Sequence, residues 1–244
     1  MSFRKTPTRH YRRPPRARAL VSQLKKEPNE LKRKLLLLGY VTDRLERKKE
    51  SVYLVGGQAV ETYTAGQFTT GDIDITTTDR KATEEILARM GFKRAGMVWL
   101  NEAIGIAFHI VGQFPTRSEK ARLVHVGPYT VRVVGVEDLI IDRLAAAKHW
   151  KSQRDAEQAR VLFDGFKKQI DIQYLRKRAK EEKVEGHSSL RAYPLRAGPA
   201  AKPAARRDDP ARVRGKFTRE RPDGEWTGPR DGSYINGGYD IRHR

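Results

Sequence analysis

Two glycines and two aspartates stand close together in the first third of the chain, in types and spacings that could do chemistry. Gly56 and Gly57 end an apolar run, and Asp72 and Asp74 follow, separated from each other by a single isoleucine. Residues two apart in a β-strand point to the same side, so the two carboxylates would project together. Such a pair repels unless a cation neutralises it, which predicts a divalent metal ion at this strand.

The glycine pair favours a phosphate beside that metal. A strand that ends in two glycines and runs into a helix leaves unpaired backbone N–H groups, with no Cβ in the way of a ligand. The helix dipole adds to the attraction for an anion at the same point. Because Mg²⁺ commonly combines one or two carboxylates with substrate phosphates, the two motifs together predict a site for a nucleoside triphosphate.

The hydrophobic pattern predicts the elements that must position these residues. Helical periodicity is seen before the glycines and again after the aspartates, and period-two alternation dominates the middle of the chain. The predicted helices are 28–45, 58–64, 79–90 and a helical region over 136–183, and the predicted strands are 51–55, 72–76, 98–100, 104–111, 122–126 and 130–134. This order predicts an α/β (α+β) fold with a mixed sheet, followed by a helical subdomain.

Composition divides the chain into four parts. Residues 1–27 are rich in Arg and Pro and poor in apolar residues, which predicts a basic N-terminal arm. The α/β domain is expected over 28–135 and the helical subdomain over 136–184. The remaining 185–244 is rich in Pro, Ala, Gly and Arg, which predicts a basic disordered tail.

The charge is concentrated in these flanks. The chain has a net charge of +20, and residues 1–34 carry 12 Lys/Arg against 2 Glu while residues 183–244 carry 14 Lys/Arg against 8 acids. Basic arms attract polyanions, which favours RNA binding, although a high positive charge also keeps a protein in solution. The sequence contains no Cys, which excludes disulfides and thiolate metal sites. No secretory signal or membrane span is apparent, so we expect no membrane partner and a cytoplasmic location.

The order strand, Gly-Gly, short helix, then Thr-x-Asp-Ile-Asp-Ile resembles the nucleotidyltransferase superfamily, whose members share the polymerase-beta-like fold. Within it, the chain is similar to the minimal prokaryotic nucleotidyltransferases of the abortive-infection and toxin–antitoxin type. The resemblance continues in residues 136–150 and 154–159, which are similar to the helical segment that follows the catalytic sheet in those proteins. It covers about residues 50–180 and leaves the arms outside.

The resemblance implies a role for each matching residue. Asp72 and Asp74 would bind Mg²⁺ and support in-line attack of an acceptor hydroxyl on the α-phosphorus of an NTP. The implied nucleotide-binding residues are Gly56, Gly57, Gln58, Thr70 and Lys148. Gln58 stands where the family usually has Ser, and Lys148 would contact a phosphate oxygen as a point charge.

One position departs from the family pattern. Active members usually carry a third carboxylate on a later strand, and His109 occupies the matching position here. An imidazole accepts a proton near pH 7, so His109 joins Asp72 and Asp74 in the expected catalytic set. It does not replace a hard oxygen ligand for Mg²⁺, and Glu102 or Glu137 would have to stand in.

Three functions remain open on these grounds. The first is a Mg²⁺-dependent nucleotidyltransferase that acts on a hydroxyl of RNA, such as a tRNA end, with an antitoxin protein as a further partner. The second is a catalytically impaired protein of the same fold that binds RNA or associates with ribosomes. The third is a nucleotidyltransferase acting on a small molecule, for which the arms would be incidental.

Overall fold

The computed structural model describes residues 17–112, 120–186 and 239–242, and for residues 18 and 239–242 the backbone alone. The predicted disorder of 1–16 and 187–238 lies outside this part of the chain. The described strands form one mixed sheet in the order β3-β4-β5-β2-β1-β7-β6-β8. Their bounds are β1 Val52–Leu54, β2 Asp72–Thr77, β3 Lys93–Ala95, β4 Val98–Asn101, β5 Ile106–Gly112, β6 Arg122–Val126, β7 Tyr129–Val133 and β8 Tyr239–Arg242.

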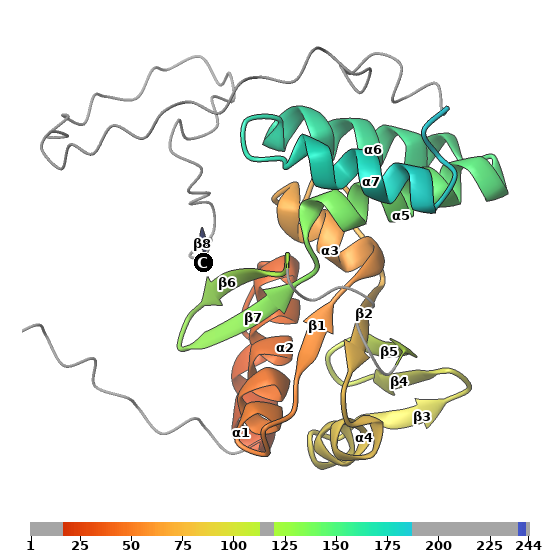
Figure 1. Ribbon diagram of the computed structural model, residues 1–244. Helices are drawn as coiled ribbons and strands as arrows, with labels where there is room; N and C mark the ends of the chain where they lie inside the picture. The colour runs from red at the N-terminus through yellow and green to blue at the C-terminus, as the bar shows by residue number, and fades with distance from the viewer. Residues whose placement is uncertain (1–16, 113–119, 187–238, 243–244) are drawn as a thin grey trace, which may run out of the picture.

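Helices lie against this sheet and beyond one end of it (Figure 1). Their bounds are α1 Ala17–Leu24, α2 Glu30–Glu46, α3 Gly56–Tyr63, α4 Arg80–Arg89, α5 Val136–Trp150, α6 Gln153–Phe166 and α7 Ile172–Glu181. Figure 1 shows α5, α6 and α7, which follow β7 in the chain, lying together next to α3. The predicted α/β fold with a mixed sheet is therefore confirmed.

The long helix α2 forms because its apolar residues recur on one side. Leu31, Leu35 and Leu38 follow helical spacing and are buried. The side chain of Asn29 accepts a hydrogen bond from the backbone N–H of Lys32 and so caps the first turn. The helix packs against β7 and β1, which places the strand before the glycine pair next to the core.

Three short elements differ from the sequence prediction. Helix α1 lies within the predicted arm, because Leu20 and Leu24 are one turn apart and are buried in the core despite the Arg-rich surroundings. Strand β3 pairs with β4 although its residues are exposed. Strand β8 comes from the predicted tail and pairs with the edge strand β6, where unpaired backbone groups offer a template.

Two pairings decide where the functional residues meet. Strand β2 is antiparallel to β1 and parallel to β5, so the start of β2 lies beside the first residues of β5, and the end of β1 lies beside Ile75 in the middle of β2. Since α3 begins directly after β1, the glycine pair is brought against the first half of β2. Within the described ranges, no helix has the length and apolar character that crossing a bilayer requires.

Candidate metal centre

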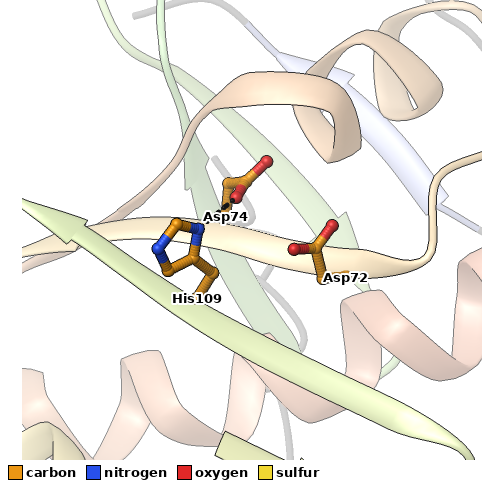
Figure 2. A group of neighbouring side chains, drawn as sticks. All are labelled: Asp72, Asp74 and His109. Carbon is orange, nitrogen blue, oxygen red and sulfur yellow. Dashed lines mark ion pairs between the residues drawn. The ribbon is translucent and has the colours of Figure 1, made fainter. Parts of the chain in front are cut away.

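Strand β2 presents Asp72 and Asp74 on one side of the sheet. The intervening Ile73 and the following Ile75 are fully buried, which fixes the alternation of the strand. Figure 2 shows both carboxylates above the same face of β2. The two carboxylates lie close together, and both side chains are only partly exposed. Their charges are therefore poorly hydrated.

His109 reaches the same place from the neighbouring strand. The parallel pairing of β2 and β5 sets Asp74 opposite His109. The imidazole Nδ1 lies 3.3 Å from Oδ1 of Asp74, and Figure 2 shows the ring turned toward that carboxylate. One ligand atom from each of Asp72, Asp74 and His109 lies within 4.8 Å of the others, so the three side chains could hold a metal ion.

The glycine pair fits tightly around Asp74. Gly56 has φ +61°, a left-handed conformation, and a Cβ at this position would lie 2.4 Å from Oδ2 of Asp74. The backbone N–H of Gly57 donates to the same oxygen at 3.4 Å. Part of the glycine turn that was predicted to bind phosphate therefore faces the carboxylate of Asp74. A side chain at Gly56 would displace Asp74, so this glycine positions the acid.

The charge on Asp74 is poorly compensated within the protein. Burial raises the pKa of Asp74, and the negative charge of Asp72 raises it further. The hydrogen bond from Gly57 and the nearby His109 work in the opposite direction without cancelling these effects. A site that disfavours its own carboxylate charge gains the most from a bound cation.

Thr70 is held beside Gly57 by a buried lysine that the sequence analysis did not single out. Lys34 is 1% exposed, and its ammonium donates to the carbonyl of Thr70 at 2.5 Å. The same ammonium lies 2.8 Å from Glu30 and 3.4 Å from Glu61. Lys34 occupies the apolar stripe of α2, three residues after Leu31, and a charge inside such a stripe is the signal that would have revealed it.

A cleft of about 550 Å³ opens beside the metal centre. Gly56, Asp74 and His109 line one side of it, and Asp138 and Arg178 line the other. This volume is in the range of small-molecule sites in proteins. The cleft therefore lies between the sheet and the helices α5 and α7, with Asp74 and His109 at one wall and Asp72 next to them.

The helical wall of the cleft consists of paired charges. Arg178 donates through Nε to Asp138 at 2.8 Å and through Nη1 to Glu181 at 2.7 Å. Tyr174 donates its hydroxyl to Asp138 at 2.9 Å. Burial works against the charged guanidinium, but these hydrogen bonds leave the pKa of Arg178 raised. Sequence reasoning missed this cluster because its members lie on two helices and meet only through packing.

Of the five predicted nucleotide-binding residues, Gly56 alone lines the cleft; Gly57 contacts Asp74 and Thr70, while Gln58 and Lys148 lie away from the site. Gln58 is fully buried, and its side-chain amide has no hydrogen-bond partner in the described structure. The helix begins at Gly56 rather than at Gln58, which turns Gln58 inward. Lys148 lies past the cleft end of α5 and donates to the carbonyl of Lys183 at 2.6 Å.

Neither of the expected substitute carboxylates joins the metal centre. Glu137 is buried and accepts the backbone N–H of Asp171 at 2.9 Å, so it supports the start of α7. Glu102 is exposed in the turn between β4 and β5. Among the described residues, His109 is the third member of the only cluster with metal-ligand spacing.

No protein-family model and no curated protein matches the chain. Solved structures that resemble it include the following two. An antigenic nucleotidyltransferase-like protein from Paracoccidioides brasiliensis has a TM-score of 0.49 and 12% identity, over 68% of this chain and 92% of that one. The antibiotic-resistance factor ANT(2'')-Ia has a TM-score of 0.33 and 18% identity, over 60% of this chain and 94% of that one. Both TM-scores lie below 0.5, and both sequence identities lie below 25%.

Proposed function

We propose that this chain is a metal-dependent nucleotidyltransferase that moves a nucleotide from an NTP to a hydroxyl acceptor. The observation that carries the proposal is the convergence of Asp72, Asp74 and His109, two of which, Asp74 and His109, line a cleft. Two carboxylates with an adjacent open cleft suit Mg²⁺ that also binds substrate phosphates. The raised pKa of Asp74 supports the same conclusion, because the protein supplies too little positive charge of its own.

Asp72 and Asp74 would hold Mg²⁺, which when bound neutralises phosphate charge and polarises the phosphoryl group. Gly56 keeps Asp74 in place and leaves its oxygen facing the cleft. His109 would accept the proton of the attacking hydroxyl, and Asp74, 3.3 Å from Nδ1, would orient the ring. The residues of the chain thus position the reactants and move one proton.

RNA is the proposed acceptor, with a tRNA end as one form of it. The basic flanks, residues 1–27 and 185–244, support this choice, because Lys and Arg gain affinity for phosphates by releasing counterions. A cytoplasmic setting and an antitoxin protein as partner belong to the same proposal. If transfer proceeds without any nucleic acid in the assay, the acceptor is a small molecule instead.

One observation favours a second candidate, a protein of this fold that binds RNA and nucleotide without turnover. An imidazole stands where a third carboxylate would complete the metal ligands, and neither Glu102 nor Glu137 replaces it. The two candidates predict different results for the same measurement. The first requires release of pyrophosphate, and the second requires nucleotide and RNA binding with none.

Transfer of a radiolabelled nucleotide to RNA, with Mg²⁺ present, tests the proposal. We expect the double variant Asp72→Asn/Asp74→Asn to lose transfer by on the order of 10³-fold or more. His109→Gln should lose roughly 10²- to 10⁴-fold, as removal of a general base does. The matched control is His125→Gln, since His125 lies on β6 and bonds to Thr130. Unchanged transfer in the double aspartate variant would refute the proposal.

A further inference from the structure

Trp150 is the most exposed large apolar side chain in the described part of the chain, at 81%. It is the last residue of α5, directly before the reversal into α6. Lys151, the next residue, has φ +52°, a left-handed conformation that costs a non-glycine residue about 1 kcal/mol or more. The α5–α6 turn, residues 148–154, therefore has a defined shape that leaves the indole in solvent.

This turn is positively charged and contains no acid. Its sequence is Lys-His-Trp-Lys-Ser-Gln-Arg. Among the described residues, no carboxylate forms an ion pair with Lys151. The nearest acid in sequence, Asp155, is already bound by Arg143 at 2.9 Å. An exposed aromatic ring thus lies beside uncompensated positive charge, which is the composition that binds unpaired nucleic-acid bases and their phosphates.

The turn also touches the segment that leads into the metal centre. Arg154 donates through Nη2 to the carbonyl of Thr69 at 2.9 Å. The next residue, Thr70, lies beside Gly57, and Asp72 begins β2 two residues later. Gly71 has open space where a Cβ would stand. A single-stranded nucleic acid that lies across the turn can therefore continue along residues 69–71, which contain no acid, before it comes to Asp72.

We propose that the α5–α6 turn is the binding surface for a single-stranded RNA acceptor. An unpaired base stacks on Trp150, and Lys151 and His149 contact the flanking phosphates. The surface belongs to the folded part of the chain and is separate from the basic flanks. The proposal rests on the nucleotidyltransferase function, because it names how the acceptor approaches that site.

Binding of a fluorescein-labelled, single-stranded 12-nucleotide RNA to the full chain tests the surface by anisotropy. EDTA is present throughout, so no transfer takes place and the metal centre does not contribute. We expect Trp150→Ala to weaken binding by about tenfold at every salt concentration, since stacking does not depend on counterion release. Trp150→Phe should recover most of that loss. The control is Met97→Ala, because Met97 is also exposed, at 78%, in the turn between β3 and β4.

The charge contribution is measured by a salt series. We expect Lys151→Ala to reduce the slope of log K against log [salt] by about 0.7, the value for one phosphate contact on a single strand. Lys81→Ala, an exposed lysine on α4, is the control and should leave the slope unchanged. A duplex of the same sequence should bind Trp150→Ala and the unmodified chain equally, because its bases are stacked.

The outcomes separate this surface from the proposed function. If Trp150→Ala and Met97→Ala bind the single strand with equal affinity, the proposed binding surface is wrong. It is also wrong if Trp150→Ala loses affinity equally for the single strand and for the duplex. If transfer depends on Asp72 and Asp74 while RNA affinity ignores Trp150, the function stands and the surface falls. If RNA affinity depends on Trp150 and no transfer is detected, the surface stands and the enzyme proposal falls.

Discussion

Asp74 and Asp138 line the same cleft, and the fold compensates their negative charges to very different extents. Asp138 receives a guanidinium nitrogen of Arg178 and the hydroxyl of Tyr174, both within 2.9 Å. Asp74 receives one backbone N–H at 3.4 Å, and its burial, together with the negative charge of Asp72, raises its pKa. On the helical wall, Arg178 neutralises the charge of Asp138. On the wall formed by β2, a bound cation would have to neutralise the charge of Asp74.

This difference separates structure from function within one cavity. A paired acid such as Asp138 ties α5 to α7 and holds the wall in place. Two neighbouring acids whose charge the fold compensates only in part, such as Asp72 and Asp74, lower its stability, so their presence calls for a functional reason. Variants on the two walls should therefore affect different properties, stability on one and metal binding on the other.

The largest expected effect on stability is on the helical wall. Arg178→Met leaves Asp138 buried without its cation, which should lower the free energy of unfolding by about 3–5 kcal/mol. Urea denaturation measures the change. Arg160→Met is the matched control, because Arg160 is 57% exposed and its pair with Asp164 should contribute at most about 1 kcal/mol. A loss no larger than that of the control would mean that the wall does not depend on this pair.

A smaller effect is expected at the glycine that positions Asp74. Gly56→Ala places a methyl group in a left-handed conformation and against Oδ2 of Asp74, which should cost roughly 2 kcal/mol and weaken Mg²⁺ binding. Calorimetric titration with Mg²⁺ and thermal unfolding measure the two effects. Gly96→Ala separates them, because Gly96 has φ +62° with nothing within 4 Å of its Cβ position. It should lose stability and keep its metal affinity. Equal metal affinity in both variants would contradict the positioning role of Gly56.

The metal centre could be predicted from the sequence because most of the residues that define it lie close together in the chain. Alternation of Asp72, Ile73 and Asp74 along one strand already places the acids on one side, and the glycine pair marks the turn next to them. The family pattern led to His109 as the third position, and the β2–β5 register brings it to Asp74. Short-range periodicity and a known spacing are sufficient for such a site.

The charge cluster on the helical wall could not be predicted from the sequence. Asp138 and Arg178 are 40 residues apart and meet only because α5 and α7 pack together. Lys148 lies about one turn beyond Ala145, the last residue of α5 at the cleft, and the carbonyl of Lys183, just after α7, accepts its ammonium group. Helical phase predicts the face of a residue, whereas its position along the cleft depends on where the neighbouring helix ends.

The smallest effect concerns Asp74 itself and has an unusual sign. The folded state raises the pKa of Asp74, so the protonated form is favoured, and its contribution to stability is lost as pH rises through the raised pKa. In EDTA, Asp74→Asn should therefore be more stable than the unmodified chain at pH 7, and this advantage should shrink as the pH falls toward the ordinary value of a carboxyl group.

Metal reverses the order of the two proteins. Mg²⁺ at ten times its Kd should stabilise the unmodified chain by about 1.4 kcal/mol and leave Asp74→Asn nearly unchanged. Thermal unfolding over a pH series, with EDTA and then with Mg²⁺, measures both trends. The control is Asp164→Asn, whose side chain is 49% exposed and should show neither trend. If Asp74→Asn is the less stable protein in EDTA at pH 7, the acids on β2 are compensated within the fold, and the contrast with Asp138 is wrong.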